Sequence, residues 1–182
     1  WMGRVSLSST GFYKTPDIHW DSDKRKGKPF YYFVYGAAVS EIILDTLTGE
    51  SRVVGVDILH DVGRSINPAI DRGQIEGGFV QGLGWLSMEE LVYADNGTLM
   101  THSPATYKIP TCSDIPNNWN IAFYEGQGNL EETINRSKAV GEPPFMLAMS
   151  VFFAYSHALT SMQAKYPNLD SPATAERLYF AQ

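Results

Sequence analysis

The chain has 182 residues, a formal net charge of −6 and 43% hydrophobic residues, which suffices for a folded core and excludes a disordered chain. Basic residues gather only between Lys24 and Lys28. This patch is too small for a nucleic-acid-binding face, so we expect no nucleic-acid partner. The single cysteine, Cys112, excludes an internal disulfide and a thiolate-bound metal, and it suits a reducing cytoplasm.

The start of the chain and its longest apolar stretch bear on location. Trp1 and Met2 are followed by no charged and apolar leader, so we expect no signal peptide. Residues 145–159 are apolar but contain polar interruptions and are short for a membrane span, which predicts no membrane association and a cytoplasmic location. The abrupt first residues predict that residues 1–182 are one piece of a longer polypeptide.

The first third of the chain predicts strands. Residues 4–9 alternate apolar and polar side chains, as a short strand does, whereas residues 11–28 are rich in Pro, Asp, Lys and Gly and predict a loop. Residues 30–45 and 52–62 are dense in aromatic and β-branched side chains. The glycine-containing turn at residues 46–50 should join them into an antiparallel hairpin.

Two long helices are predicted in the second half. Asn67 followed by Pro68 marks the start of the first, because asparagine is a favoured N-cap residue and proline suits the first helical position. This helix should end near Leu91. Residues 145–165 should form the second long helix, and residues 171–174 should cap a short final helix.

Shorter elements should fill the space between the two long helices. Residues 93–101 predict a small hairpin, residues 103–118 a proline-containing connector, and residues 119–125 a further strand. Strands followed by helices in this order predict the α+β class, with the antiparallel hairpin packed against two long helices.

The first long helix carries an unusual load of glycine. Each glycine costs a helix about 0.5–1 kcal/mol relative to alanine, so this helix should need the missing side chains. The glycines could let another backbone approach closely, or they could form part of a ligand face with the two glutamines, whose amides match the edge of a pterin or purine. The residues on that predicted face, at helical spacing, are Gln74, Gly77, Gly78 and Gln81. The residues predicted to pack on the sheet are Ile75, Phe79, Leu83 and Leu86.

Glu142 lies between Gly141 and two prolines at the mouth of the second long helix. Pro143 disfavours a helical backbone at the residue before it, which predicts an extended Glu142 on a stiff stem. Such a stem could present one acid or base to a ligand. The alternative is a structural carboxylate that is favoured there by the helix dipole.

Other candidate sites are weaker. The histidines lack the i, i+4 spacing of a zinc site, and the cluster Asp57, His60 and Asp61 is better explained by strand alternation and a turn. The glycines lie within a helix rather than between a strand and a helix, which argues against a dinucleotide-binding loop, and a P-loop is absent from the sequence.

Three motifs in order give the chain a specific resemblance. Residues 73–77 (Gly-Gln-Ile-Glu-Gly), 107–110 (Tyr-Lys-Ile-Pro) and 138–144 (Lys-Ala-Val-Gly-Glu-Pro-Pro) resemble the molybdenum hydroxylases, the xanthine dehydrogenase and aldehyde oxidase family. The resemblance extends over nearly the whole chain. It implies that residues 1–182 are the C-terminal portion of the molybdopterin-binding domain, most similar to the molybdopterin-binding subunit of bacterial xanthine dehydrogenases.

The resemblance also implies roles for site residues. Glu142 would be the catalytic base and Gln74 a molybdopterin contact, with Gly77, Gly78 and Gly141 beside the cofactor and no metal ligand from this chain. Xanthine or hypoxanthine would be hydroxylated to urate with oxygen from water. Electrons would pass to 2Fe-2S clusters and FAD in partner domains or subunits, since one cysteine cannot ligate such clusters.

Two alternatives remain open from the sequence. The chain could come from an aldehyde- or nicotinate-type molybdenum hydroxylase, or it could be a non-catalytic interaction fragment. The substrate-clamping residues of the family are expected upstream, in the remainder of the molybdenum subunit, so the isolated chain should be inactive.

Overall fold

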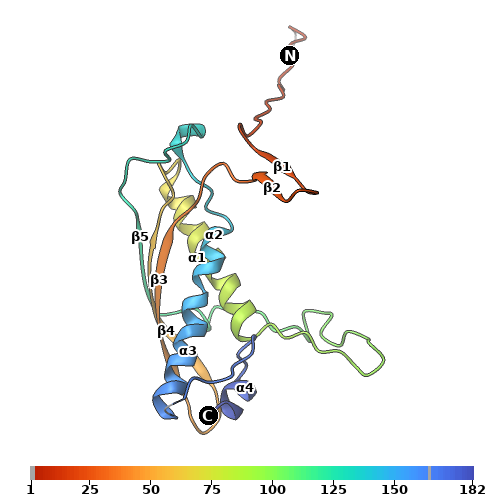
Figure 1. The fold of residues 1–182 in the computed structure, drawn as a ribbon, viewed down its shortest axis with the longest axis vertical. Helices are drawn as coiled ribbons and strands as arrows, with labels where there is room; N and C mark the ends of the chain where they lie inside the picture. Colours follow the sequence, from red (N-terminus) through yellow and green to blue (C-terminus); the bar gives the residue numbers. More distant parts are fainter. Residues whose placement is uncertain (1–2, 164) are drawn as a thin grey trace. The chain divides into compact units, whose positions relative to one another are not determined.

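The computed structural model describes residues 3–163 and 165–182 (Figure 1). The chain divides into two compact units, Trp1–Phe33 and Val34–Gln182, and each is described by itself.

The first unit contains one small hairpin, in which β1 (His19–Asp21) pairs antiparallel with β2 (Lys26–Lys28). The predicted strand at residues 4–9 is wrong: no strand forms there, because its apolar side chains have no core to enter, and Leu7 is 96% exposed. The predicted loop at residues 11–28 is interrupted by the hairpin. Its turn is closed by Asp21, whose Oδ1 accepts hydrogen bonds from two backbone N–H groups.

The second unit is built on a three-stranded sheet with the order β3-β4-β5. β3 (Gly36–Leu44) and β4 (Ser51–His60) form the predicted antiparallel hairpin, which is confirmed. Gly49 in its turn has φ of +76°, and a side chain there would overlap the carbonyl oxygen of Ala175. β3 begins later than predicted because its partner β4 ends opposite Gly36, which leaves residues 30–35 with no strand to pair with.

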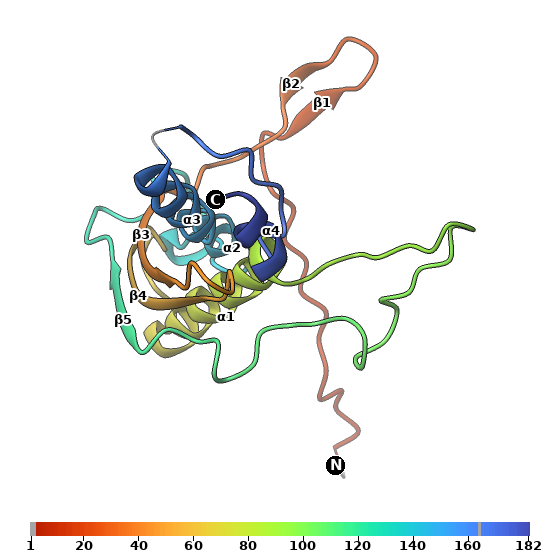
Figure 2. The ribbon, with the colours of Figure 1, turned by 90° about the horizontal axis from the view of Figure 1, so that it is seen from below.

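β5 (Asn118–Phe123) forms where a strand was predicted, and it pairs parallel to β4. The predicted hairpin at residues 93–101 is reduced to an isolated bridge between Tyr93 and Leu99, with Gly97 in the turn. The loop that contains this turn projects away from the sheet, and the chain then returns past α1 to β5 (Figure 2).

The first long helix, α1 (Pro68–Ser87), begins as predicted: the Asn67 side chain accepts hydrogen bonds from the N–H groups of Ala69 and Ile70. It ends four residues earlier than predicted: the N–H groups of Met88 and Glu89 both bond to the Gly84 carbonyl, and the backbone of Met88 is no longer helical.

The second long helix is divided into α2 (Pro143–Leu147) and α3 (Met149–Met162). The division falls at Ala148, whose N–H bonds to the Phe145 carbonyl three residues back, as in a 3₁₀ turn. A single-turn 3₁₀ helix, η1 (Ile134–Arg136), precedes α2. The final helix, α4 (Ala175–Phe180), is capped by the side chain of Thr174 as predicted.

The helices pack on one face of the sheet (Figures 1 and 2). The four α1 residues predicted to face the sheet, Ile75, Phe79, Leu83 and Leu86, are all buried. They meet apolar side chains of β4, β5 and α3 in one cluster. The α+β class is therefore confirmed.

Among the described residues, one helical run, Pro143–Met162, is long and apolar enough to cross a membrane. It is longer than the apolar stretch considered in the sequence, since the prolines and Met162 belong to it. One such helix is weak support for a membrane span, because a core helix of a soluble protein has the same length and composition.

Candidate functional site

Gln74 of α1 and the segment before α2 lie next to each other. An atom at the Cβ position of Gly141 would be 3.6 Å from Oε1 of Gln74, and both residues are exposed. Glu142 follows immediately and is exposed as well. The fold therefore brings the predicted amide and the predicted carboxylate to neighbouring positions on two different helices.

Glu142 opens α2 without capping it. Its side chain makes no hydrogen bond to the first turn of the helix, so the carboxylate is not engaged in capping. The prediction of an extended backbone is wrong: Glu142 has φ −97° and ψ −34°, in the helical region. The cause is a tight turn in which the N–H of Phe145 bonds to the Glu142 carbonyl at 2.9 Å, around the two prolines.

The predicted ligand face of α1 is divided by the structure. Gly77 is exposed, and nothing lies within 4 Å of the Cβ position that it lacks. Gly78 is buried, with its Cβ position 3.2 Å from the Gly141 carbonyl oxygen and 3.3 Å from Cβ of Pro144. Gly77 thus borders open space beside Gln74, whereas Gly78 serves the close approach of another backbone.

The segment that carries Glu142 is anchored to the end of β4. Nζ of Lys138 lies 2.6 Å from Oδ2 of Asp61, and only 8% of the lysine and 14% of the aspartate side chain are exposed. The backbone N–H of Lys138 donates to the Val62 carbonyl, and Gly63 forms an antiparallel bridge with Ser137. The sequence did not predict this ion pair, because Asp61 is interpreted as a turn residue and is 77 positions away from Lys138.

The neighbouring cluster of Asp57, His60 and Asp61 is not a joint site. Asp57 is exposed and accepts a hydrogen bond from the Asn120 amide, while His60 is turned into the core with 1% exposure. Nδ1 of His60 has no hydrogen-bond partner. Burial lowers the pKa of His60 from its ordinary value, although the charges of Asp61 and Asp71 act in the opposite direction.

The buried His60 should make the stability of the folded chain sensitive to acid. Because the pKa of His60 is lower in the folded chain, the unfolded chain binds the proton more tightly, so the contribution of His60 to stability is complete above about pH 6.5. It should be lost progressively as pH falls from that value through the folded pKa. Urea unfolding of the purified chain at pH 7.5 and 5.5 measures the loss, and His60→Gln, which cannot take up the proton, should reduce the pH dependence. An equal pH dependence of the unfolding free energy in the parent and in His60→Gln would contradict this role of His60.

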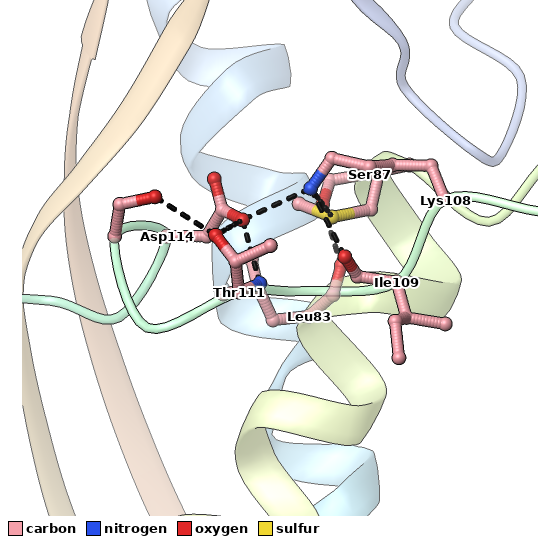
Figure 3. Close-up of polar contacts among 8 residues, drawn as sticks. Leu83, Ser87, Lys108, Ile109, Thr111 and Asp114 are labelled. Atoms are coloured by element: carbon pink, nitrogen blue, oxygen red, sulfur yellow. Dashed lines mark hydrogen bonds and ion pairs between the residues drawn. The ribbon is translucent and has the colours of Figure 1, made fainter. Parts of the chain in front are cut away.

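The Tyr-Lys-Ile-Pro motif lies at the other end of α1 (Figure 3). Nζ of Lys108 forms an ion pair with Asp114 at 3.0 Å, and the Tyr107 hydroxyl donates to Glu89. A side chain at Gly84 would overlap Pro110, which packs on the helix there. The motif therefore fixes the C-terminal end of α1 rather than contributing to the surface around Gln74.

Burial alone would raise the pKa of Asp114, but hydrogen bonds from Thr111 and Lys108 outweigh it and hold that pKa below its ordinary value. Hydrogen bonding to Glu89 raises the pKa of Tyr107. The shift at Asp114 reflects contacts within the connector, whereas the shift at Tyr107 reflects the contact of the connector with Glu89, just after α1.

Two hollows border these regions. One, of about 830 Å³, lies beside Asp61 and Lys138 and is walled by Tyr35, Leu59 and Tyr124. The other, of about 560 Å³, lies between the C-terminal end of α1 and the start of β4. Gln74 and Glu142 are outside both, on the open surface. Within residues 3–163 and 165–182, no group of three or more His, Cys, Asp or Glu side chains is arranged to hold a metal ion.

The fold described above is that of a known family of cofactor-binding domains. Residues 1–116 match the family model of the molybdopterin cofactor-binding domain, and the chain belongs to this family.

Among curated proteins, the chain is 49% identical to a xanthine dehydrogenase of Oryza sativa subsp. japonica, over 100% of this chain and 14% of that protein. It is 48% identical to the xanthine dehydrogenase/oxidase of Rattus norvegicus, over 96% of this chain and 14% of that protein. The chain thus spans about one seventh of the length of these relatives.

Solved structures agree with the fold. The quinoline 2-oxidoreductase of Pseudomonas putida 86 matches with a TM-score of 0.70 and 30% identity, over 78% of this chain and 18% of that one. The aldehyde oxidoreductase of Desulfovibrio gigas matches with a TM-score of 0.67 and 27% identity, over 90% of this chain and 17% of that one.

Proposed function

We propose that this chain supplies the general base and part of the cofactor surface of a molybdenum hydroxylase, and that the complete protein hydroxylates purines of the xanthine type. The observation that carries the proposal is the position of the Gln74 amide beside Gly141, directly before the exposed Glu142. Similarity to two xanthine dehydrogenases at 48–49% identity favours a purine over an aldehyde. Residues 1–182 would form the C-terminal portion of the cofactor domain.

The residues present fit a pterin cofactor. The amide of Gln74 can donate and accept hydrogen bonds in one plane, as the edge of a pterin requires. Gly77 leaves open space next to it, and Gly141 presents backbone without a side chain. Gln74, Gly77 and Gly141 would therefore hold the cofactor, which when bound supplies two-electron redox chemistry at molybdenum.

Glu142 would act as the general base. A base must be ionised and within hydrogen-bond reach of the proton that it removes. Its carboxylate is exposed, makes no capping hydrogen bond, and is held on a turn stiffened by two prolines. One carboxylate oxygen would accept the proton of the water-derived nucleophile while the oxygen of that nucleophile bonds to the substrate carbon. The hydrogen that leaves this carbon would carry its bonding electron pair to the redox centre of the cofactor. The remaining oxygen can orient the side chain through a further hydrogen bond.

The electrons must then leave through other parts of the protein. Cys112, the one cysteine in the sequence, is exposed and cannot by itself ligate an iron–sulfur cluster. The proposed partners are therefore the remainder of the molybdenum subunit and domains or subunits with 2Fe-2S clusters and FAD. A cytoplasmic location belongs to the same proposal.

Substrate assays on the complete protein test the assigned activity. Turnover should be faster with xanthine or hypoxanthine than with benzaldehyde or nicotinate, and urate formed in ¹⁸O-labelled water should carry the label. Faster oxidation of benzaldehyde would assign the protein to the aldehyde-oxidising branch instead. Molybdenum-replete protein that oxidises none of these substrates would overturn the proposal.

The role of Gln74 has a separate test. In the complete protein, Gln74→Ala should lower molybdenum content or substrate reduction of the cofactor by roughly 10–100-fold, as loss of a residue that orients a metal's surroundings does. Gln127→Ala is the control, because Gln127 is also an exposed glutamine but lies in the loop after β5, outside the predicted ligand face of α1. Metal analysis by mass spectrometry and anaerobic reduction with xanthine give the comparison. Equal losses in the two variants would remove Gln74 from the cofactor surface.

A further inference from the structure

One face of α1 runs along the whole segment that carries Glu142. Gln74, Gly78, Gly82 and Trp85 follow one another at intervals of three or four residues, so they share that face. Opposite them lie residues 141–148: Gly141 faces Gln74 and Gly78, and Phe145 faces Gly82. The turn that carries Glu142 thus packs directly on α1, the helix that carries Gln74.

The contact at Gly82 is the tightest on this face. A Cβ atom there would overlap the carbonyl oxygen of Phe145 and would lie 2.7 Å from Cβ of Ala148. Backbone atoms cannot rotate away as a side chain does, so any side chain at this position must push α2 away from α1. One turn further on, the rings of Trp85 and Phe145 stack with their centroids 5.2 Å apart.

Gly78 makes a milder contact at the start of the same segment. Its Cβ position lies 3.2 Å from the Gly141 carbonyl oxygen and 3.3 Å from Cβ of Pro144, and Pro144 is buried. An added methyl group there requires a displacement of a few tenths of an ångström. This displacement would fall on Gly141, immediately before Glu142, and on Pro144, two residues after it.

α2 is closely held on its other side as well. Both Cδ atoms of Leu147 lie 3.3 Å from the Cβ position of Gly36, at the start of β3. A glycine therefore lies against α2 on both sides, on α1 and on β3. α2 can approach α1 and β3 this closely because these side chains are missing.

We propose that Gly78 and Gly82 are positioning residues, which set the distance between α1 and α2 and thereby hold the Glu142 carboxylate in register with the Gln74 amide. This inference rests on the proposed roles of Glu142 and Gln74. It gives a functional reason for Gly78 and Gly82, namely close packing that fixes the base. A base displaced by about 1 Å can lose roughly 10²-fold in rate.

The test compares Gly82→Ala, Gly78→Ala and Gly73→Ala in the complete protein. Gly73 lies on the same helix, and nothing is within 4 Å of its Cβ position, so Gly73→Ala is the matched control. We expect kcat to fall by roughly 10²-fold in Gly82→Ala and by a smaller factor in Gly78→Ala, with little change in KM or molybdenum content. Gly73→Ala should keep the parent kcat.

Hydrogen exchange gives a readout that does not depend on turnover. The amides of Phe145 and Ala148 bond within the α2 region and should exchange faster in Gly82→Ala than in Gly73→Ala. Faster exchange with an unchanged kcat would mean that the glycines serve packing alone, and it would overturn the positioning role. Unchanged exchange and unchanged kcat in Gly82→Ala would overturn it too. If Gly82→Ala does not fold, the same criteria apply to Gly78→Ala.

Failure of the positioning role is distinguishable from failure of the proposed function. A normal rate for Glu142→Gln would remove the base itself, whatever the glycine variants do. A slow Glu142→Gln combined with a fast, folded Gly82→Ala would remove only the positioning role.

Discussion

Replacing Glu142 by glutamine in the complete protein should lower turnover by roughly 10²–10⁴-fold, the range for loss of one general base. Glutamine keeps the size of the side chain and its hydrogen-bonding capacity but cannot accept the proton. Molybdenum content should stay at the parent level, because Gln74, Gly77 and Gly141 are unchanged. The measurement is the rate of cofactor reduction by xanthine on metal-matched samples.

The alternative role of Glu142, a carboxylate favoured by the helix dipole, has its own control. Glu176 is an acidic residue in the first turn of α4, away from the site. If Glu142 acts only through the dipole, Glu142→Gln and Glu176→Gln should each cost about 0.3–1 kcal/mol of stability and leave turnover near normal. A normal rate of reduction in Glu142→Gln would therefore end the assignment of this residue as the base.

Local signals in the sequence were sufficient for most of the fold. Asn67 caps α1 at the predicted residue, and the α1 stripe that includes Ile75 and Phe79 is buried, because N-cap chemistry and the helical period act within a few residues of the chain. The β3–β4 hairpin is equally local, since its turn alone brings the strands together. Strand alternation without a partner misled the prediction at residues 4–9.

Contacts between distant segments could not be predicted in this way. The parallel pairing of β5 with β4 joins one strand that precedes α1 in the sequence to one that follows it, and no local pattern specifies this pairing. Gly77 and Gly78 are adjacent in sequence, yet one borders open space and the other the Gly141 carbonyl. Glu142 likewise has a helical backbone because of the turn around the two prolines, although a residue before proline prefers an extended backbone.

The ion pair between Asp61 and Lys138, the most buried ion pair of the described residues, also joins distant segments and could not be predicted from local patterns. Removing one partner of a buried ion pair takes away the opposite charge that faces the other and costs about 3–5 kcal/mol. Asp61→Asn and Lys138→Met should therefore each destabilise the chain by an amount in this range. Glu132→Gln is the control, because the exposed ion pair of Glu132 with Arg136 should contribute only about 0–1 kcal/mol.

The double variant separates the pair from its surroundings. In Asp61→Asn with Lys138→Met neither charge remains, so the loss of stability should be clearly smaller than the sum of the two single losses. Urea unfolding of the four proteins gives this coupling energy. Lys138 lies four residues before Glu142, and its backbone N–H bonds to the Val62 carbonyl. The single variants should therefore disturb the segment that carries Glu142 and slow substrate oxidation in the complete protein as well. Strictly additive losses of stability would mean that the 2.6 Å contact contributes little, and that the backbone bonds alone hold the base in place.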